Sequence, residues 1–497
     1  MVALPGRSAI GLWLGLLLFV LLLALPPPQD MPPSAWRAAA VATLMATWWI
    51  TEAIPIAATA LLPIALFPLL GVMPTPQVTT SYANHLIYLF LGGFLIAMAM
   101  QKWNLHRRIA LRTIRVVGVS PPRIVLGFML ATAFLSMWIS NTATAMMMLP
   151  IALAVIGQIR EMTSAEAAEA ERSGEEAQRF ATALMLGIAY AASIGGVATL
   201  IGTPPNAILA GVVERLYGFT IGFAAWMAFG LPLAAVMLAI AWIYLVRFVY
   251  AGTTLTLTGA SELVAREIAA LGAMSREEKW ILTIFSMVAL LWIIRGFLDL
   301  RFLGMASDAT IAIAGALLLF MIPSNWRKRE FLLDWASAVQ LPWDILILFG
   351  GGFALAHGFS ESGLTQWIAS QLSALSGVHL SLLVLAVAVV VLFLTEVTSN
   401  TATATLILPV LGATSEAVGV HPFGLMVPAA VAASYAFMLP VATPPNAIVF
   451  SSRFITIPQM AKAGLWMNLI ACLVIAAFVL LVLPLLWDID LGAPLRR

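Results

Sequence analysis

Ser140-Asn-Thr-Ala-Thr-Ala-Met-Met-Met-Leu-Pro150 returns 259 residues later as Ser399-Asn-Thr-Ala-Thr-Ala-Thr-Leu-Ile-Leu-Pro409, with eight of the eleven positions identical. Both copies are rich in hydroxyl and amide groups, and both lie in very apolar sequence. Polar groups at membrane depth are costly unless they have partners, so they usually mark a function. The doubled phrase therefore predicts two halves of one fold that share one site.

The composition indicates an all-α polytopic membrane protein. The 497 residues are 62% hydrophobic and 10% charged, whereas a soluble domain carries roughly 25% charged residues. We expect about eleven transmembrane helices plus two shorter elements, each full span needing about 20 apolar residues. The protein is then a multi-pass protein of the cell membrane. A net charge of +2 without a basic tail gives no sign of a nucleic-acid partner, and the single Cys472 excludes an intrachain disulfide.

The repeat extends beyond the doubled phrase. Leu-Phe-Leu-Gly-Gly-Phe94 resembles Leu-Phe-Gly-Gly-Gly-Phe353, again 259 residues apart. Gly202-Thr-Pro-Pro-Asn-Ala-Ile208 resembles Ala442-Thr-Pro-Pro-Asn-Ala-Ile448, 240 residues apart. The shorter second spacing is consistent with a longer charged loop at 158–178 in the first half.

The charges predict that the two halves enter the membrane from opposite faces. The first segment to compare, 102–123, is strongly basic. The segment 259 residues later, 361–382, carries Glu361 and no Lys or Arg. By the positive-inside rule the first segment is cytoplasmic and the second is outside, which predicts an inverted repeat. The first segment, 102–123, carries six basic residues and no acid, namely Lys102, Arg107, Arg108, Arg112, Arg115 and Arg123.

Each doubled Ser-Asn-Thr phrase is predicted to lie at the tip of a re-entrant hairpin. Residues 124–157 contain no charge, and as one helix they would be about 51 Å long against a hydrocarbon core of about 30 Å. Two short limbs, 124–139 and 142–157, fit better, and 380–415 has the same character. Non-helical backbone at such a tip is tolerated only where it is buried in protein or lines a cavity.

The second limb of each hairpin begins with a helix N-terminus, where Ser, Asn and Thr are favoured caps. In the two Thr-Pro-Pro-Asn phrases, Thr203 and Thr443 are candidate caps, and Pro204 and Pro444 suit the first helical position. Each phrase would break a long helix (178–215 and 424–452), although a simple proline kink is the alternative.

Four helix N-termini would then meet near the bilayer midplane. Each carries roughly half a positive charge, so together they suit a dianion. None of the four phrases contains Lys or Arg. Helix ends bind an anion more gently than a buried cation would, which suits a carrier that must release its cargo.

Hydroxyl, amide and carbonyl oxygens in the same phrases are suitable ligands for sodium. Ser136 lies one helical turn before Ser140, and Thr395 holds the same place before Ser399. The alternative is that both hydroxyls bond back to the helix carbonyl four residues earlier. Glu396, an acid within the second hairpin, is either a proton or cation partner or a structural acceptor for helix-end amides.

These phrases resemble those of the divalent anion–sodium symporter family, the INDY-type di- and tricarboxylate transporters, over nearly the whole chain. The resemblance implies a homodimer in which a mobile transport domain moves against a scaffold, as an elevator does. It places scaffold helices in 1–123 and 219–379. It places the transport domain, with both hairpins and both broken helices, in 124–218 and 380–497, the latter also containing the last helix.

The resemblance also implies residue roles. Two sodium sites would use two sets, namely Ser136, Ser140, Asn141 and the Gly202 backbone in the first, and Thr395, Asn400 and the Thr398 and Ala442 backbones in the second. The residues that would face the substrate carboxylates are Asn141, Thr142, Thr203, Asn400, Thr401 and Thr443.

The predicted function is therefore sodium-coupled transport of small divalent anions, C4-dicarboxylates or citrate, by a non-enzyme that needs no cofactor apart from the coupling ions. Two alternatives keep the same fold: a sodium-independent dicarboxylate exchanger and a sulfate carrier. An intramembrane hydrolase would need a constellation of catalytic residues at depth, and no recognisable motif of that kind occurs in the sequence.

Overall fold

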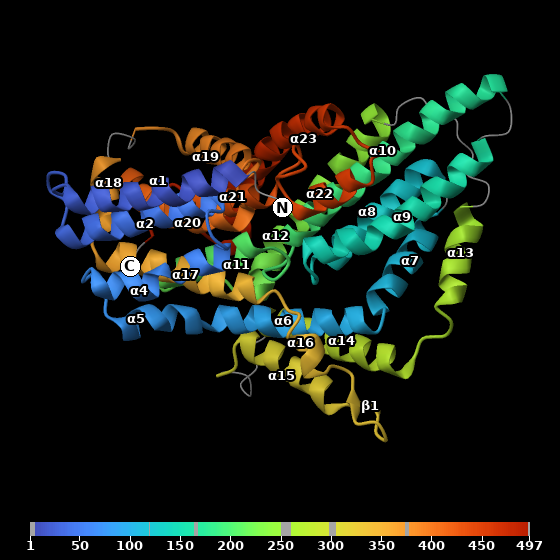
Figure 1. Cartoon of the computed structure of the whole chain (residues 1–497), viewed down its shortest axis with the longest axis horizontal. Coiled ribbons are helices and arrows are strands. Elements are labelled where there is room, and N and C mark those ends of the chain that lie inside the picture. The colour runs from blue at the N-terminus through green and yellow to red at the C-terminus, as the bar shows by residue number, and fades with distance from the viewer. Residues whose placement is uncertain are drawn as a thin grey trace.

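A computed structural model describes residues 5–118, 120–163, 167–249, 260–297, 305–372 and 377–495. Within these ranges the chain is almost entirely helical, with one short two-stranded antiparallel hairpin. The helices lie largely along the long axis of the molecule (Figure 1). Among the described residues, eight helical segments are long and apolar enough to cross a membrane, and six shorter apolar helices accompany them. The predicted all-α polytopic class is confirmed.

The first half of the chain, up to the end of its broken helix, contains eleven α-helices and one 3-10 helix within the described ranges. They are α1 (Pro5–Ala24), α2 (Pro33–Thr51), α3 (Ile56–Thr59), α4 (Leu62–Leu69), α5 (Thr75–Thr80), η1 (Ser81–Ala83), α6 (His85–Lys102), α7 (Leu105–Val117), α8 (Pro121–Ser136), α9 (Asn141–Thr163), α10 (Ala167–Val197) and α11 (Pro204–Tyr217).

The remaining elements follow in the same described ranges. They are α12 (Phe223–Tyr244), the π-helix η2 (Leu245–Val249), α13 (Ala260–Ala270), α14 (Arg276–Phe297), α15 (Asp308–Met321), β1 (Pro323–Asn325), β2 (Glu330–Phe331), α16 (Trp335–Ala338), α17 (Trp343–Glu361), α18 (Leu364–Gln371), α19 (Leu380–Thr395), α20 (Asn400–Val418), α21 (Pro422–Ser434), α22 (Pro444–Ser451), α23 (Ile457–Ala477), the π-helix η5 (Phe478–Val482) and α24 (Leu483–Trp487).

A helix–turn–helix forms at each predicted hairpin, but the second limbs, α9 and α20, are longer than predicted and long enough to cross a membrane, so the re-entrant ends stay a prediction. Helix α8 ends at Ser136 and α9 begins at Asn141, while α19 ends at Thr395 and α20 begins at Asn400. The turn is therefore four residues long in each half, at the place where the sequence predicted the bend. Figure 1 shows α8 and α9 toward one end of the molecule and α19 and α20 toward the other.

Both long helices break where the Thr-Pro-Pro-Asn phrases predicted. The first is interrupted at 198–203 between α10 and α11, and the second at 435–443 between α21 and α22. A proline kink would keep one bent helix, so the simple-kink alternative is wrong. The hairpin of each half packs against the broken helix of the other half: α9 contacts α22, and α20 contacts α11.

Some elements differ from the sequence prediction. The apolar stretch 56–69 is not one span but the pair α3 and α4, because Pro63 takes the start of a new short helix. Helix α7 is strongly amphipathic and was not predicted; its face of Leu105, Leu111 and Ile114 is buried. The polar segment between α15 and α17 contains the β-hairpin and α16.

Small residues allow the hairpin to approach the broken helix closely. A Cβ added to Gly195 of α10 would lie 2.3 Å from the carbonyl oxygen of Ala133 in α8. No such carbon fits there, because real Cβ contacts of that length essentially do not occur. The first hairpin therefore rests directly on the backbone of α10, which brings its tip beside the unwound segment.

Candidate functional site

The first hairpin tip surrounds a small group of oxygen atoms. The Oγ of Ser136 lies 2.7 Å from the Ala192 carbonyl oxygen and 2.5 Å from the side-chain amide of Asn141. The same amide atom lies 3.1 Å from the Ala192 oxygen and 3.3 Å from the Gly202 oxygen. Four groups from the hairpin, from α10 and from its break thus converge on one point.

The orientation of the Asn141 amide decides how these oxygens are satisfied. With its oxygen turned inward, that oxygen faces two carbonyl oxygens, which repel it. With its nitrogen turned inward, it donates to Ser136, Ala192 and Gly202, and Ser136 donates to Ala192. Oxygen and nitrogen of an amide are assigned from such networks. With the oxygen turned inward, a cation among these oxygens would remove their repulsion, so the cluster suits either an amide nitrogen or a bound cation.

The second tip repeats this geometry. The hydroxyl Oγ1 of Thr395 donates to Oδ1 of Asn400 at 2.7 Å and lies 3.2 Å from the Ala433 carbonyl oxygen. Thr395 and Ser136 are both fully buried. Neither hydroxyl bonds back to its own helix; each reaches the neighbouring broken helix instead, so the alternative of a local helix bond is wrong for both.

The side chains of two other residues named for the cation sites make local contacts. The Oγ of Ser140 accepts from the Ala143 amide at 3.3 Å, so this side chain caps α9. The hydroxyl of Thr398 donates to the Leu394 carbonyl at 2.8 Å and lies 2.6 Å from Thr403 Oγ1. The structure thus brings together Ser136, Asn141 and Gly202 in one half and Thr395 and Asn400 in the other. The carbonyl that Thr395 contacts belongs to Ala433, and the backbones of Thr398 and Ala442 stay predicted ligands.

The predicted substrate-facing residues divide into two groups. Asn141, Thr142, Asn400 and Thr401 begin the second limbs of the two hairpins and are half-buried. Thr203 and Thr443 precede α11 and α22 and are buried, at 2% and 4% exposure.

Only one of the two threonines caps its helix. Thr443 accepts from the Asn446 amide at 3.3 Å, as predicted. Thr203 makes no side-chain cap bond, so its predicted capping role is wrong. Its Oγ1 lies 3.4 Å from the Oγ of Ser434 at the end of α21. This contact joins the broken helix of one half to that of the other, which draws the Thr203 hydroxyl away from its own helix start.

Two asparagines that the sequence analysis did not assign hold the unwound segments in place. Nδ2 of Asn206 donates to the carbonyls of Val197 and Thr199 at 3.2 and 2.8 Å. Nδ2 of Asn446, 240 residues later, donates to Ala436 and Leu439, both at 3.0 Å. A buried carbonyl left without a donor is costly. The last polar residue of each Thr-Pro-Pro-Asn phrase was the available sequence signal.

Glu396 satisfies the longer unwound segment of the second half. Its Oε1 accepts from the amides of Phe437 and Met438 at 2.8 and 2.9 Å, and Oε2 accepts from Leu439 at 3.1 Å. Nδ2 of Asn468 in α23 donates to Oε1 at 2.7 Å. Of the two roles weighed for this acid, the structural acceptor of backbone amides matches these contacts.

The first half has no acid at the place of Glu396, where Met137 stands instead. There the Thr199 hydroxyl donates to the Met137 carbonyl at 2.5 Å. At this place in the first half, the Thr199 hydroxyl of the break bonds to the hairpin turn. In the second half, the Glu396 carboxylate of the hairpin turn accepts from three backbone amides of the break and from Asn468. The difference accompanies the different lengths of the two breaks.

The chain matches the family described as the sodium:sulfate symporter transmembrane region over residues 7–488. This chain belongs to that family. The sodium-dependent dicarboxylate transporter SdcS of Staphylococcus aureus strain USA300 is 50% identical over 489 residues, which cover 98% of this chain and 93% of SdcS. The same transporter from strain NCTC 8325 has the same identity and coverage.

Two solved structures share the fold at low sequence identity. The YdaH transporter of Alcanivorax borkumensis has a TM-score of 0.53 and 15% identity, covering 95% of this chain and 97% of YdaH. MtrF of Neisseria gonorrhoeae has a TM-score of 0.56 and 13% identity, covering 94% of this chain and 98% of MtrF. The likeness extends over nearly the full length of each chain, so this chain shares their fold.

Proposed function

We propose that this chain is a secondary active transporter that moves small divalent anions, C4-dicarboxylates first among them, together with sodium ions. The observation that carries the proposal is the pair of matched oxygen clusters, Ser136–Asn141 with Ala192 and Thr395–Asn400 with Ala433. Each cluster offers neutral oxygen ligands from a hairpin and a broken helix. The name of SdcS, a sodium-dependent dicarboxylate transporter at 50% identity, supports sodium as the coupling ion and a dicarboxylate as the cargo.

Sodium binding at these clusters would prepare the anion site beside them. A cation between the Asn141 oxygen and the Ala192 and Gly202 carbonyls would hold the hairpin tip against the break in α10. The helix starts at Asn141 and Asn400 would then present their free amides to a carboxylate. Because the cation and the anion would neutralise each other's charge, each would favour binding of the other.

The transport movement is proposed to be an elevator motion within a homodimer. The segments 124–218 and 380–497 would move as one transport domain, in keeping with the packing of α9 against α22 and of α20 against α11. The scaffold segments would be 1–123 and 219–379. Helix α12 packs against α10 and α23 as well as α14, so it would follow the boundary between the two domains.

The decisive experiment uses purified protein in liposomes. Labelled succinate uptake into empty vesicles should be driven by an inward sodium gradient. Uptake only into succinate-loaded vesicles, with no response to sodium, would instead identify an exchanger. Unlabelled malate, citrate and sulfate as competitors would rank the substrates, and stronger competition by sulfate than by malate would contradict a dicarboxylate carrier.

Replacement of Asn400 tests the second cluster directly. We expect Asn400→Ala to abolish sodium-driven succinate uptake, since the substitution removes the amide that faces Thr395 and begins α20. Asn325→Ala makes the same change in the β-hairpin and should leave uptake unaltered. Size-exclusion chromatography checks that both variants remain folded. Wild-type uptake by Asn400→Ala would refute the assigned role.

A further inference from the structure

A cavity separate from the hairpin tips lies between three helical elements. Its volume is about 680 Å³, and α10, the α12–η2 helix and α23 form its walls. Volumes of about 300–1,000 Å³ are typical of sites that enclose small organic molecules. The elements that line it belong to long apolar helices, including the continuous helix Ile457–Trp487.

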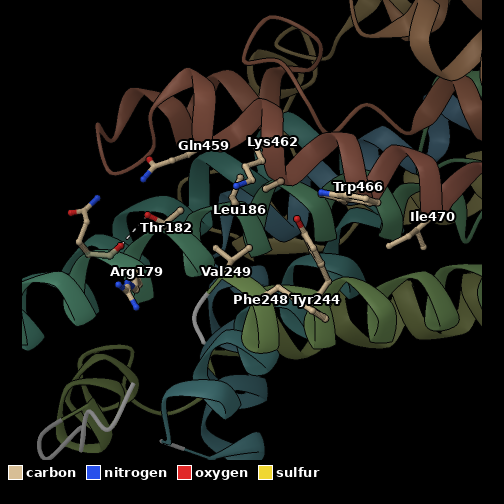
Figure 2. Close-up of a pocket in the computed structure, with 12 residues that line it drawn as sticks. Arg179, Thr182, Leu186, Tyr244, Phe248, Val249, Gln459, Lys462, Trp466 and Ile470 are labelled. Carbon is tan, nitrogen blue, oxygen red and sulfur yellow. Dashed lines mark hydrogen bonds between the residues drawn. The ribbon is translucent and has the colours of Figure 1, made fainter. Parts of the chain in front are cut away.

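The walls change from polar to apolar along the helices. Gln459, Lys462, Trp466 and Ile470 follow one another on one face of α23. Helix α10 shows the same change from polar to apolar, since Arg179 is followed by Thr182 one turn later and by Leu186 two turns later. Figure 2 shows Arg179, Gln459 and Lys462 toward one end and Trp466 and Ile470 toward the other. From Lys462 to Ile470 the helix rises about 12 Å, so the apolar end reaches well below the charged end.

Charge and aromatic residues at the cavity fit a molecule with an anionic head. Lys462 is exposed and forms no ion pair with any described residue within salt-bridge distance. Arg179 is 3.6 Å from Glu175, and both side chains are more than half exposed, which makes this a weak pair that an anion can replace. Tyr244 and Trp466 line the same cavity, and such residues favour the level of lipid headgroups.

We propose that this cavity binds one anionic phospholipid, with its phosphate between Arg179 and Lys462 and an acyl chain along Leu186, Trp466 and Ile470. Basic pockets between transmembrane helices recognise anionic headgroups in this way. A small dicarboxylate would fill only the charged end and would leave the apolar walls without a partner. A zwitterionic lipid carries a cation beside its phosphate, so it would be attracted less strongly to Arg179 and Lys462 than an anionic lipid.

Native mass spectrometry of the purified full-length protein provides the test. It is titrated with phosphatidylglycerol or with phosphatidylcholine of the same acyl chains. Each basic side chain near an anionic headgroup is expected to contribute about fivefold in affinity. Arg179→Gln combined with Lys462→Gln should therefore weaken phosphatidylglycerol binding about thirtyfold, to the level of phosphatidylcholine. Lys328→Gln, an exposed basic residue of the β-hairpin, is the matched control and should change nothing.

A second variant tests the apolar part independently. Ala463→Phe places a large side chain in the cavity and should reduce binding of phosphatidylglycerol while both cations remain. Equal affinity of wild type for the two lipids, or equal phosphatidylglycerol affinity in wild type and the double variant, would overturn the proposal. Displacement of the lipid by inorganic phosphate or succinate at equal concentration would also overturn it, because it would identify a site for free anions.

Discussion

Asn206 and Asn446 show how single side chains stabilise backbone that has left the helix. Each is fully buried, and each donates from one amide nitrogen to carbonyls of the break that precedes it. The two residues are 240 positions apart, and so are the last residues of the breaks they hold, Thr203 and Thr443. The same solution therefore serves both halves, although the breaks differ in length.

Removal of the Asn446 amide should destabilise the folded protein. Asn446→Ala leaves the Ala436 and Leu439 carbonyls without this donor, and a buried polar group that loses its partner costs about 1–3 kcal/mol. We expect a lower midpoint of thermal unfolding, measured in detergent at fixed sodium concentration. Asn325→Ala, in the β-hairpin, should have a smaller effect. An unchanged midpoint for Asn446→Ala would show that other groups satisfy these carbonyls.

The sequence predicted the residues of the site better than their individual partners. Ser136, Asn141, Thr395 and Asn400 meet as expected, because their spacing puts a hydroxyl one turn before each tip. Thr203 did not behave as Thr443 does, because its partner Ser434 comes from the other half of the chain. Contacts between distant segments have no local sequence signal, so the symmetry of the repeat alone misassigned this threonine.

At the scale of elements, close packing of α8 on α10 fixes where the first tip lies. Gly195→Ala would place a Cβ 2.3 Å from the Ala133 carbonyl oxygen and 2.5 Å from its Cα. Overpacking of this kind costs about 1–3 kcal/mol. We therefore expect Gly195→Ala to lower both the thermal midpoint and the succinate uptake rate, as the hairpin is pushed from the oxygen cluster.

Gly157→Ala in α9 is the matched control for that substitution. A Cβ at Gly157 meets no atom within 4 Å. Alanine in a helix is favoured over glycine by roughly 0.5–1 kcal/mol, so the thermal midpoint should stay the same or rise slightly. Equal behaviour of the two variants would mean that α10 can shift to accommodate Gly195→Ala without loss.

The contact between α6 and the start of α16 predicts how the stability of the folded protein changes at low pH. Nζ of Lys102 lies 2.5 Å from Oδ2 of Asp334, and this hydrogen bond, together with that from the Ser337 amide, lowers the pKa of the Asp334 carboxyl from 3.8 to about 2. A carboxyl whose pKa is lower in the folded protein stabilises it above the unfolded pKa, and this contribution disappears as pH falls toward 2. The pair is partly exposed, so the effect is small.

Asp334→Asn isolates that charge, because asparagine can still cap α16 as Asp334 does through the Ser337 amide. The thermal midpoint of wild type should exceed that of the variant slightly at pH 6, and the difference should shrink as pH is lowered from 4 toward 3. A difference that grows with acid would contradict this assignment.

The sequence indicated the long helices, both hairpins and both breaks, since each has a strong signal in apolar length, polar tips or paired prolines. It did not indicate α7 as a separate amphipathic helix, or the division into α3 and α4. Short elements of that kind depend on the surfaces they rest on. Helix α7, for example, is held by Arg108, which pairs with Glu278 of α14 at 2.7 Å.

At the scale of the whole molecule, contacts join the proposed scaffold to the proposed transport domain. Asn84, at the start of α6, donates to Glu214 of α11 at 3.3 Å, and His85 lies 3.6 Å from the same carboxylate. Arg215 of α11 contacts His357 of α17. An elevator motion must separate these groups in each cycle.

Cross-linking tests this motion in a Cys472→Ala background, which has no other cysteine. A cleavable thiol cross-linker joining Asn84→Cys to Glu214→Cys should stop succinate uptake, and cleavage should restore it. The control pair Lys102→Cys and Asp334→Cys joins two scaffold segments and should leave uptake intact. Normal uptake with the first cross-link in place would argue against movement between these domains.

The neutral character of the four helix starts has a consequence for acidity. None of the doubled phrases contains Lys, Arg, His, Asp or Glu, so the phrases themselves have no group that titrates near neutrality. Under the proposed function, mild acid would act on the solute, since a dicarboxylate that gains a proton offers half the charge to the partial positive charges of the helix ends. The pH dependence of transport would then come from the substrate. Uptake would fall as the pH drops through the second acid dissociation constant of each dicarboxylate.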